Sequence, residues 1–224
     1  MKKIIENIVI PCIIVISSIL LGIVFNDYKL GVITLIAGFL NAYYAAIGKW
    51  YNYIYGIIFC ITYSIACYLN GLYGAAIFNL AIYIPIQIYG IINWRKKDDE
   101  NNIVKVKALS LKYGLLLTLF ICSGSALLGY LFDMIPTQNL SYLDSTSQFI
   151  NIGAIILNTL AFTEGWYVGL ANNVIDLIIW IINFKHGTIH SEMMLVVSII
   201  YLVMNIYGIV NWVLIKKKQS NIYK

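Results

Sequence analysis

Two seven-residue stretches of the chain are nearly identical, and each closes a long apolar segment. Residues 88–94 read IYGIINW and residues 206–212 read IYGIVNW, so that the copies differ at one position. A basic run follows each copy, at 95–97 and at 216–218. Because Lys and Arg gather on one side of a membrane, we infer a duplication whose two copies end on the same side of a bilayer.

The composition restricts the chain to membranes. It is 61% hydrophobic and 11% charged, whereas soluble domains are about half apolar and about a quarter charged. Short polar breaks leave apolar segments of about 18 to 22 residues, the length at which a helix spans a bilayer. The first ends near Val24 and lacks a small-residue cleavage motif, so we interpret it as a retained span. The other predicted spans are 30–47, 51–69, 73–94, 111–132, 148–162, 166–184 and 193–215.

The basic residues test this division. With the N-terminus inside, thirteen of the 15 Lys and Arg residues fall on the cytoplasmic side, and only Lys29 and Lys185 fall outside. We therefore predict eight spans with both termini in the cytoplasm. The net charge of +5 then marks topology in a lipid bilayer, and no nucleic acid partner is predicted.

The duplication extends beyond the two heptads, since Trp50 pairs with Trp166 and Tyr83 with Tyr201. A three-span unit starts and ends on opposite sides, so a parallel second copy requires an intervening helix. The predicted fold is an all-α integral membrane protein with a 1+3+1+3 order and two parallel three-helix repeats. Its parts are an N-terminal helix at 1–25, a first repeat at 30–94, a cytoplasmic linker and linking helix at 95–132, and a second repeat at 148–218. Transporters use such repeats, with a pathway between the halves.

Asp176 is the one acidic residue deep inside a predicted span, where an uncompensated carboxylate is costly. On helical spacing it shares a face with Trp166, Gly169, Asn173 and Trp180. We interpret this stripe as a binding pocket with aromatic walls, an amide and an anion. In the alternative interpretation, the two tryptophans lie in the interfacial belts and Asp176 forms a hydrogen bond with a neighbouring helix.

Two further polar stripes recur on the predicted fourth and eighth spans. They comprise Asn79, Tyr83 and Gln87 on the fourth, and Ser198, Tyr201 and Asn205 on the eighth. Amides both donate and accept, which suits a carboxamide or a sugar hydroxyl, although the same groups also hold helices together. Pro85 removes a helical hydrogen bond from the fourth span and permits a bend there.

The ends of the spans carry weaker signals. Gly90 and Gly208 are predicted to allow close helix approach, with Trp94 and Trp212 at the headgroup level. The longest outer connection is predicted at 133–147, and Asp144 lies in it.

No catalytic or metal-binding motif emerges. His186 and His190 lie near Glu192, but histidines in an outer loop are more often solvated than metal-bound. The four cysteines lie in apolar segments and predict no disulfide. Walker, GxSxG and HExxH motifs are missing from the sequence, so we predict neither an enzyme nor a metal or cofactor.

The chain resembles the PnuC-type nicotinamide riboside transporters. The resemblance covers about residues 31–218 and rests on residues 71–74, on Asn79 with 83–87, on Glu164 and Trp166 with Asn173, and on 205–212. It implies a fold similar to a full-length SWEET transporter and facilitated diffusion of a vitamin precursor across the bacterial inner membrane, with the precursor trapped by a cytoplasmic kinase. It also implies that Trp166, Asn173 and the amides and tyrosines of the fourth and eighth spans line the substrate site.

Two positions depart from this family pattern. Gly169 stands where the family tends to have a second tryptophan, and Asp176 stands where it has a small polar residue. A carboxylate in a low-dielectric site favours a cation, which nicotinamide riboside and thiamine both are. Nicotinamide riboside is the preferred substrate, with thiamine or riboflavin as alternatives. A proton-coupled carrier with Asp176 as relay, a non-transporting membrane assembly or sensor protein, and a homo-oligomer also stay open.

Overall fold

The apolar segments of the sequence form the helices of the protein. The computed structural model describes residues 4–96 and 105–222, and every named element in these ranges is helical. In chain order the elements are η1 (Ile5–Val9), α2 (Ile10–Val24), α3 (Leu30–Ala46), α4 (Asn52–Leu69), α5 (Tyr73–Phe78), η2 (Asn79–Tyr83), α6 (Ile84–Arg95), α7 (Leu111–Asp133), α8 (Ser141–Thr159), α9 (Glu164–Lys185) and α10 (Ser191–Ile222). The basic residues Lys2, Lys3, Lys97 and Lys224 lie outside the described ranges.

Two of the helical rods are composite, because η1 continues into α2, and α5, η2 and α6 follow one another without a break. Within residues 4–96 and 105–222, six rods are long and apolar enough to cross a membrane. The apolar helix α3 is shorter, at 17 residues, and the more polar α8 falls outside that group. The expectation of an all-α membrane protein is confirmed.

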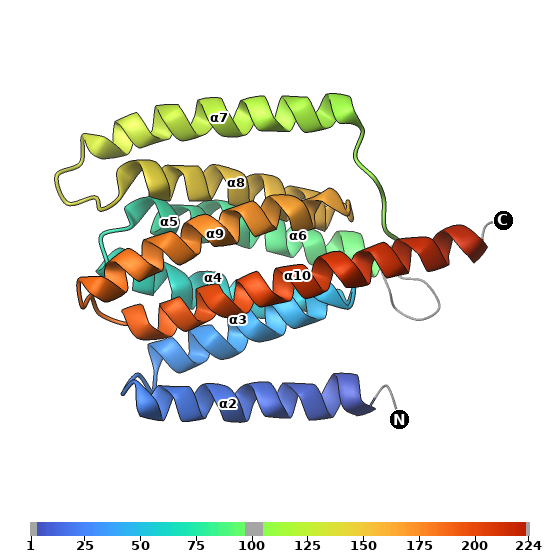
Figure 1. Ribbon diagram of the computed structural model, residues 1–224, viewed down its shortest axis with the longest axis horizontal. Helices are drawn as coiled ribbons and strands as arrows, with labels where there is room; N and C mark the ends of the chain where they lie inside the picture. Colours follow the sequence, from blue (N-terminus) through green and yellow to red (C-terminus); the bar gives the residue numbers. More distant parts are fainter. Residues whose placement is uncertain (1–3, 97–104, 223–224) are drawn as a thin grey trace.

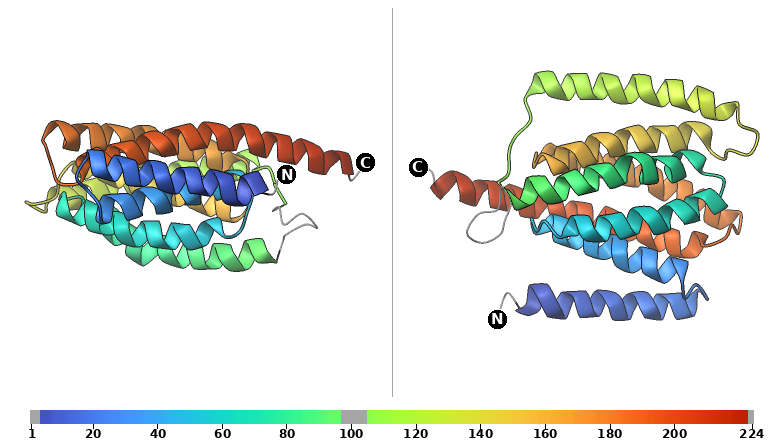
Figure 2. Two further views of the ribbon diagram at one scale, coloured as in Figure 1. Left: turned by 90° about the horizontal axis from the view of Figure 1, so that it is seen from below. Right: turned by 180° about the vertical axis from the view of Figure 1, so that it is seen from behind.

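Six rods form a closed ring around the centre of the molecule. Each packs on the next in the order α3, α4, α5–α6, α8, α9 and α10, and α10 packs back on α3. Helix α2 packs mainly on α3, and α7 packs mainly on α8. They therefore flank the ring on opposite sides (Figures 1 and 2), and the two chain ends emerge together at one end of the molecule. We call this the terminal end, and the other the distal end.

The protein exposes large apolar side chains and buries many polar ones, which is the opposite of the distribution in a soluble protein. Large apolar side chains such as Leu119 of α7 and Ile13 of α2 are exposed, at 67% and 60%. Amides and carboxylates such as Asn79, Asn173 and Asp144 are buried inside the ring. A chain that exposes apolar surface and hides its polar groups is suited to lipid.

Helix α8 begins at Ser141, so the prediction that it begins at residue 148 and that Asp144 belongs to an outer loop is wrong. Asp144 is 1% exposed and accepts a hydrogen bond from the backbone N–H of Ala75 at 3.0 Å. The first N–H groups of a helix lack partners within it, and Gly74 leaves room for the carboxylate. The distal ends of α8 and α5 are thereby joined.

The tryptophans of the repeated heptads are buried inside the protein. Trp94 and Trp212 are 1% and 0% exposed, and their rings contact each other with centroids 5.7 Å apart. The structure thus packs both rings between helices, and their headgroup-level depth stays a prediction. Gly90 and Gly208 do permit close approach, since a Cβ atom there would overlap the rings of Tyr53 and Trp166.

Each heptad also binds a helix end that is remote in the sequence. We call the two sets of contacts the Asn-Trp clasps: in both, a neighbouring asparagine and tryptophan donate to backbone oxygens. The pairs are Asn93 Nδ2 and Trp94 Nε1 to Thr159 O at 2.6 and 3.0 Å, Asn211 Nδ2 to Ala46 O at 2.8 Å, and Trp212 Nε1 to Ala45 O at 3.1 Å. The last carbonyls of a helix have no partner within it, so the clasps satisfy the ends of α8 and α3.

Candidate functional site

A polar cavity occupies the centre of the six-rod ring. Eight of the nine predicted site residues line it. They are Asn79, Tyr83, Gln87, Trp166, Asn173, Asp176, Tyr201 and Asn205. The structure thus brings together the stripes of the α5–α6 rod, α9 and α10.

Trp180 is the exception to the predicted set. It is fully buried, and its Nε1 donates a hydrogen bond of 2.8 Å to the Tyr63 hydroxyl. The Tyr63 ring meets it edge-on with centroids 5.9 Å apart, and Tyr63 itself lines the cavity. The helical face was predicted correctly, but a tyrosine from α4 lies between its last member and the cavity.

Asp176 is held by polar neighbours on α8 and α9. The Ser147 hydroxyl donates to its Oδ1, and Asn172 Nδ2 donates to its Oδ2 at 2.7 Å. Among the described residues that line the cavity, it is the one that carries a formal charge. The cavity therefore presents a carboxyl group to its contents, with no Lys, Arg or His in its described lining.

The α5–α6 rod is irregular where it meets the cavity. Residues Asn79–Tyr83 form a π-helical turn, and Pro85 follows in the first turn of α6. Proline has no N–H to donate to the preceding turn, and single π-turns are common at functional sites. This turn presents Asn79 and Tyr83, and α6 presents Gln87.

Several buried polar atoms in the lining have no hydrogen-bond partner among the described residues. Among them are the acceptors Gln87 Oε1 and Asn205 Oδ1 and the donors Trp166 Nε1 and Asn173 Nδ2. Leaving a buried polar group unpaired costs about 1–3 kcal/mol. A ligand with both hydrogen-bond donors and acceptors would offset this cost, so the lining is suited to a compact polar molecule.

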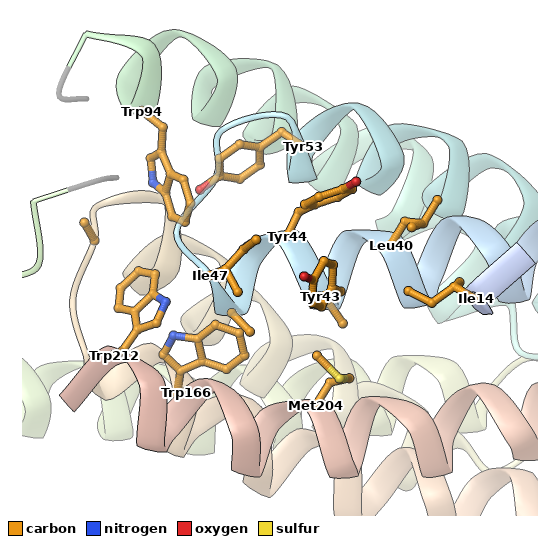
Figure 3. Close-up of a cluster of buried hydrophobic side chains, with 13 residues drawn as sticks. Ile14, Leu40, Tyr43, Tyr44, Ile47, Tyr53, Trp94, Trp166, Met204 and Trp212 are labelled. Carbon is orange, nitrogen blue, oxygen red and sulfur yellow. The ribbon is translucent and has the colours of Figure 1, made fainter. Parts of the chain in front are cut away.

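Aromatic rings close the terminal end of the cavity. Figure 3 shows Trp94, Trp166 and Trp212 gathered together with Tyr53 nearby. The Trp166 ring contacts the Trp212 ring at 5.7 Å, and the Tyr53 ring contacts the Trp94 ring at 5.0 Å. All four residues also line the cavity, so the repeated heptads contribute to the site.

Sequence reasoning missed part of the lining. The missed residues include Asn41, Phe59, Tyr63, Gln148, Asn151 and Asn158. On α4, the i, i+4 spacing of Phe59 and Tyr63, whose rings stack at 4.9 Å, was a usable signal. The amides on α3 and α8 gave no such signal, because they face the cavity only as a result of how the helices are arranged in the ring.

The histidine motif does not form a metal site in the part of the chain that the structure describes. His190 instead pairs through Nδ1 with Asp27 Oδ2 at 2.7 Å. Asp27 Oδ1 also accepts the backbone N–H of Gly31 at 2.9 Å. The pair links the distal ends of α3 and α10.

Comparisons with known proteins agree with this architecture. The family model described as "Nicotinamide mononucleotide transporter" matches residues 28–214. The chain belongs to this family. The resemblance in the sequence is therefore confirmed, and the chain is a multi-pass membrane protein of a transporter family.

Members of the family supply more specific likenesses. A protein of Neisseria mucosa named nicotinamide riboside transporter PnuC is 30% identical over 208 residues, covering 88% of this chain and 77% of the relative. A PnuC of Haemophilus influenzae is 25% identical over 197 residues, covering 87% and 83%. The crystal structure of the vitamin B3 transporter PnuC superposes with a TM-score of 0.78 at 25% identity, covering 93% of this chain and 90% of that one.

Proposed function

We propose that the protein carries nicotinamide riboside across the bacterial inner membrane by facilitated diffusion. The observation that supports this most is the composition of the cavity: amides, aromatic rings and one carboxylate, Asp176, without a basic residue in the described lining. The riboside has a fixed positive charge, a flat ring, a carboxamide and ribose hydroxyls. Attraction between unlike charges is strong where water is excluded, so the cation and Asp176 are complementary.

The same composition favours the riboside over the mononucleotide that gives the family model its name. The mononucleotide adds a phosphate, and buried phosphates are normally held by Arg, Lys or helix N-termini. The described lining offers the carboxylate of Asp176 instead, which would repel a phosphate. The names of the two PnuC relatives agree with this choice.

The ring supports an arrangement of eight spans in 1+3+1+3 order. Three consecutive rods, α3 to α6, form one half, and α8 to α10 form the other. The two halves are the parallel repeats of a SWEET-like transporter, with the leading helix at 1–25, the linker and linking helix at 95–132, and repeats at 30–94 and 148–218. The charge asymmetry places both termini in the cytoplasm. The substrate site lies between the repeats, and phosphorylation by a cytoplasmic kinase draws uptake onward.

A binding experiment on the purified protein tests the substrate. We expect nicotinamide riboside to bind more tightly than nicotinamide mononucleotide, thiamine or riboflavin in titration calorimetry. Thiamine bound far more tightly than the riboside would replace the assignment with thiamine. Tighter binding of the mononucleotide would contradict the charge argument.

A second candidate function is proton-coupled transport. It is favoured by the placement of Asp176 in a buried polar chain with Ser147 and Asn172, because intramembrane carboxylates serve as proton relays. Uptake into liposomes without a kinase distinguishes the two mechanisms. A uniporter equilibrates the riboside whether or not a protonophore is present, whereas a proton-coupled carrier loses accumulation when the gradient collapses.

A further inference from the structure

Asp144 is a buried carboxylate that the proposed function does not use. It accepts hydrogen bonds from Ala75 N at 3.0 Å, from Gln138 Nε2 at 2.8 Å and from Gln148 Nε2 at 3.0 Å. All three partners are N–H groups. An ionised carboxylate only accepts, so these contacts fix the amide of Gln148 with its NH₂ group toward Asp144.

The orientation of a second amide at Asp144, that of Gln138, is fixed by backbone groups. Gln138 Oε1 accepts the N–H of Tyr73 at 3.0 Å, and its Nε2 also donates to the carbonyl of Asn139 at 3.0 Å. Main-chain N–H and C=O groups cannot exchange roles. Gln138 is thus locked in one orientation, and its NH₂ group requires an acceptor at Asp144.

The fixed order of hydrogen-bond donors and acceptors continues from Asp144 toward the cavity. With the Gln148 NH₂ group toward Asp144, its Oε1 faces Tyr83, which donates to this oxygen at 2.9 Å and to the Gln148 backbone oxygen at 3.0 Å. A tyrosine hydroxyl has one proton, and its oxygen also accepts. Because the proton is committed to Gln148, the hydroxyl oxygen can only accept, both from the Asn151 side chain and from a ligand in the cavity.

We propose that Asp144 is a positioning residue that sets the hydrogen-bond polarity of the substrate site through Gln148 and Tyr83. It presents the Tyr83 hydroxyl oxygen to the cavity as an acceptor, so the substrate group that binds there is an O–H or N–H donor. A ribose hydroxyl and a carboxamide NH₂ both belong to this class. The proposal rests on the proposed function, and Asp144 acts without touching the substrate.

Asp27 provides a matched control on the other side of the ring. It is also a carboxylate at the distal end, and it joins α3 to α10 through His190. Its contacts with His190 and Gly31 do not lead to the equivalent tyrosine, because Tyr201 donates to Asn41 Oδ1 at 3.1 Å. Asp27→Asn therefore removes a distal carboxylate without changing the polarity of a tyrosine in the cavity.

The test is a double-mutant cycle on binding of nicotinamide riboside to the full-length protein in detergent. Asp144→Asn lets the Gln148 amide turn over and donate to Tyr83, and Tyr83→Phe removes the hydroxyl. Each change should weaken binding by about fivefold to tenfold, the size of one hydrogen bond. The double variant should bind no more weakly than Tyr83→Phe alone, and Asp27→Asn should bind like the wild type. Losses that multiply in the double variant would overturn the proposal, because Asp144 would then act independently of Tyr83.

A second cycle needs no ligand. In the ligand-free protein the same hydrogen-bond chain should make the Tm shifts of Asp144→Asn and Tyr83→Phe smaller in combination than their sum. Strictly additive Tm shifts would show that Asp144 and Tyr83 are not coupled through hydrogen bonds, and would overturn the proposal. If the wild type binds neither the riboside nor thiamine nor riboflavin, the proposed function fails while this cycle still decides the positioning role. If Asp144→Asn does not fold, Gln148→Met replaces it in both cycles, with the same expected coupling to Tyr83.

Discussion

At the scale of single residues, the charge of Asp176 has the most direct consequence. Asp176→Asn keeps the size of the side chain but removes the charge opposite a cationic ligand. Hydrogen bonds to charged groups contribute about 1.5–3 kcal/mol, so binding of nicotinamide riboside should weaken by about tenfold to a hundredfold in titration calorimetry. The reduced dihydro form of the riboside is uncharged, and its affinity should change little. An equal loss for both ligands would show that Asp176 acts through packing.

The glycine of the second heptad supports a second prediction. A Cβ atom at Gly208 would overlap the Trp166 ring, so Gly208→Ala should displace this wall of the cavity. Overpacking typically costs about 1–3 kcal/mol, and uptake should fall with a lower Tm. Gly114→Ala is the matched control, since the nearest atom to its Cβ lies 3.9 Å away. Normal uptake by Gly208→Ala would mean that the position of Trp166 is unimportant.

The stripe on α9 was predictable, because helical periodicity alone determines which of its residues share a face. The role of Trp180 was not predictable, since it depends on a hydrogen bond to Tyr63, which is distant from Trp180 in the sequence. Asp144 was misplaced for a related reason. Its environment consists of backbone N–H groups at the start of α5 and the amides of Gln138 and Gln148, and a sequence pattern does not show backbone donors.

At the scale of elements, the π-turn of the α5–α6 rod depends on Pro85. Pro85→Ala restores an N–H group and removes the reason for an irregular turn. A regular helix would rotate the residues before position 85 relative to those after it, separating Tyr83 from Gln148. We expect riboside affinity to fall by tenfold or more with little change in Tm, because the better helix propensity of alanine offsets the loss of the Tyr83–Gln148 hydrogen bond. Unchanged affinity would show that the turn forms without proline.

Hydropathy predicted the helices more reliably than their ends. The predicted spans coincide with the helical rods because a lipid-facing helix must be apolar over its whole length. Helix α8 was the exception, since its first turns are polar and its predicted start at 148 was wrong. Ser141, Asp144, Ser145 and Ser147 are buried against other helices, so their polarity reflects contacts within the ring rather than exposure to water.

At the scale of the whole molecule, the orientation in the membrane is the property most easily tested. Both chain ends lie at the terminal end (Figure 1), and the Lys and Arg distribution predicts that this end faces the cytoplasm. A fluorescent protein that matures only in the cytoplasm should therefore fluoresce when fused to either terminus. Fusion into the 134–140 connection at the distal end should give no fluorescence. Fluorescence from that connection and none from the termini would invert the topology.

The ring itself was only partly predictable. The duplicated heptads and span count indicated two parallel three-helix units, but they did not show that α2 and α7 both lie outside the ring on α3 and α8. This arrangement depends on which faces of the helices are polar. Asn41 of α3 and Gln148 of α8 turn toward the cavity, leaving their opposite faces to pack against apolar α2 and α7.

The Asn-Trp clasps offer a physical reason for the likeness of the two heptads. Their donors are side chains, whereas their acceptors are the main-chain oxygens of Ala45, Ala46 and Thr159. Every amino acid carries such an oxygen, so the acceptor helices are free to change their residues after a duplication without losing a hydrogen bond. An asparagine or indole has no such substitute. The residues that supply the acceptor oxygens are therefore free to diverge, whereas the donor asparagines and tryptophans are restrained. The likeness of the two heptads persists at the donors.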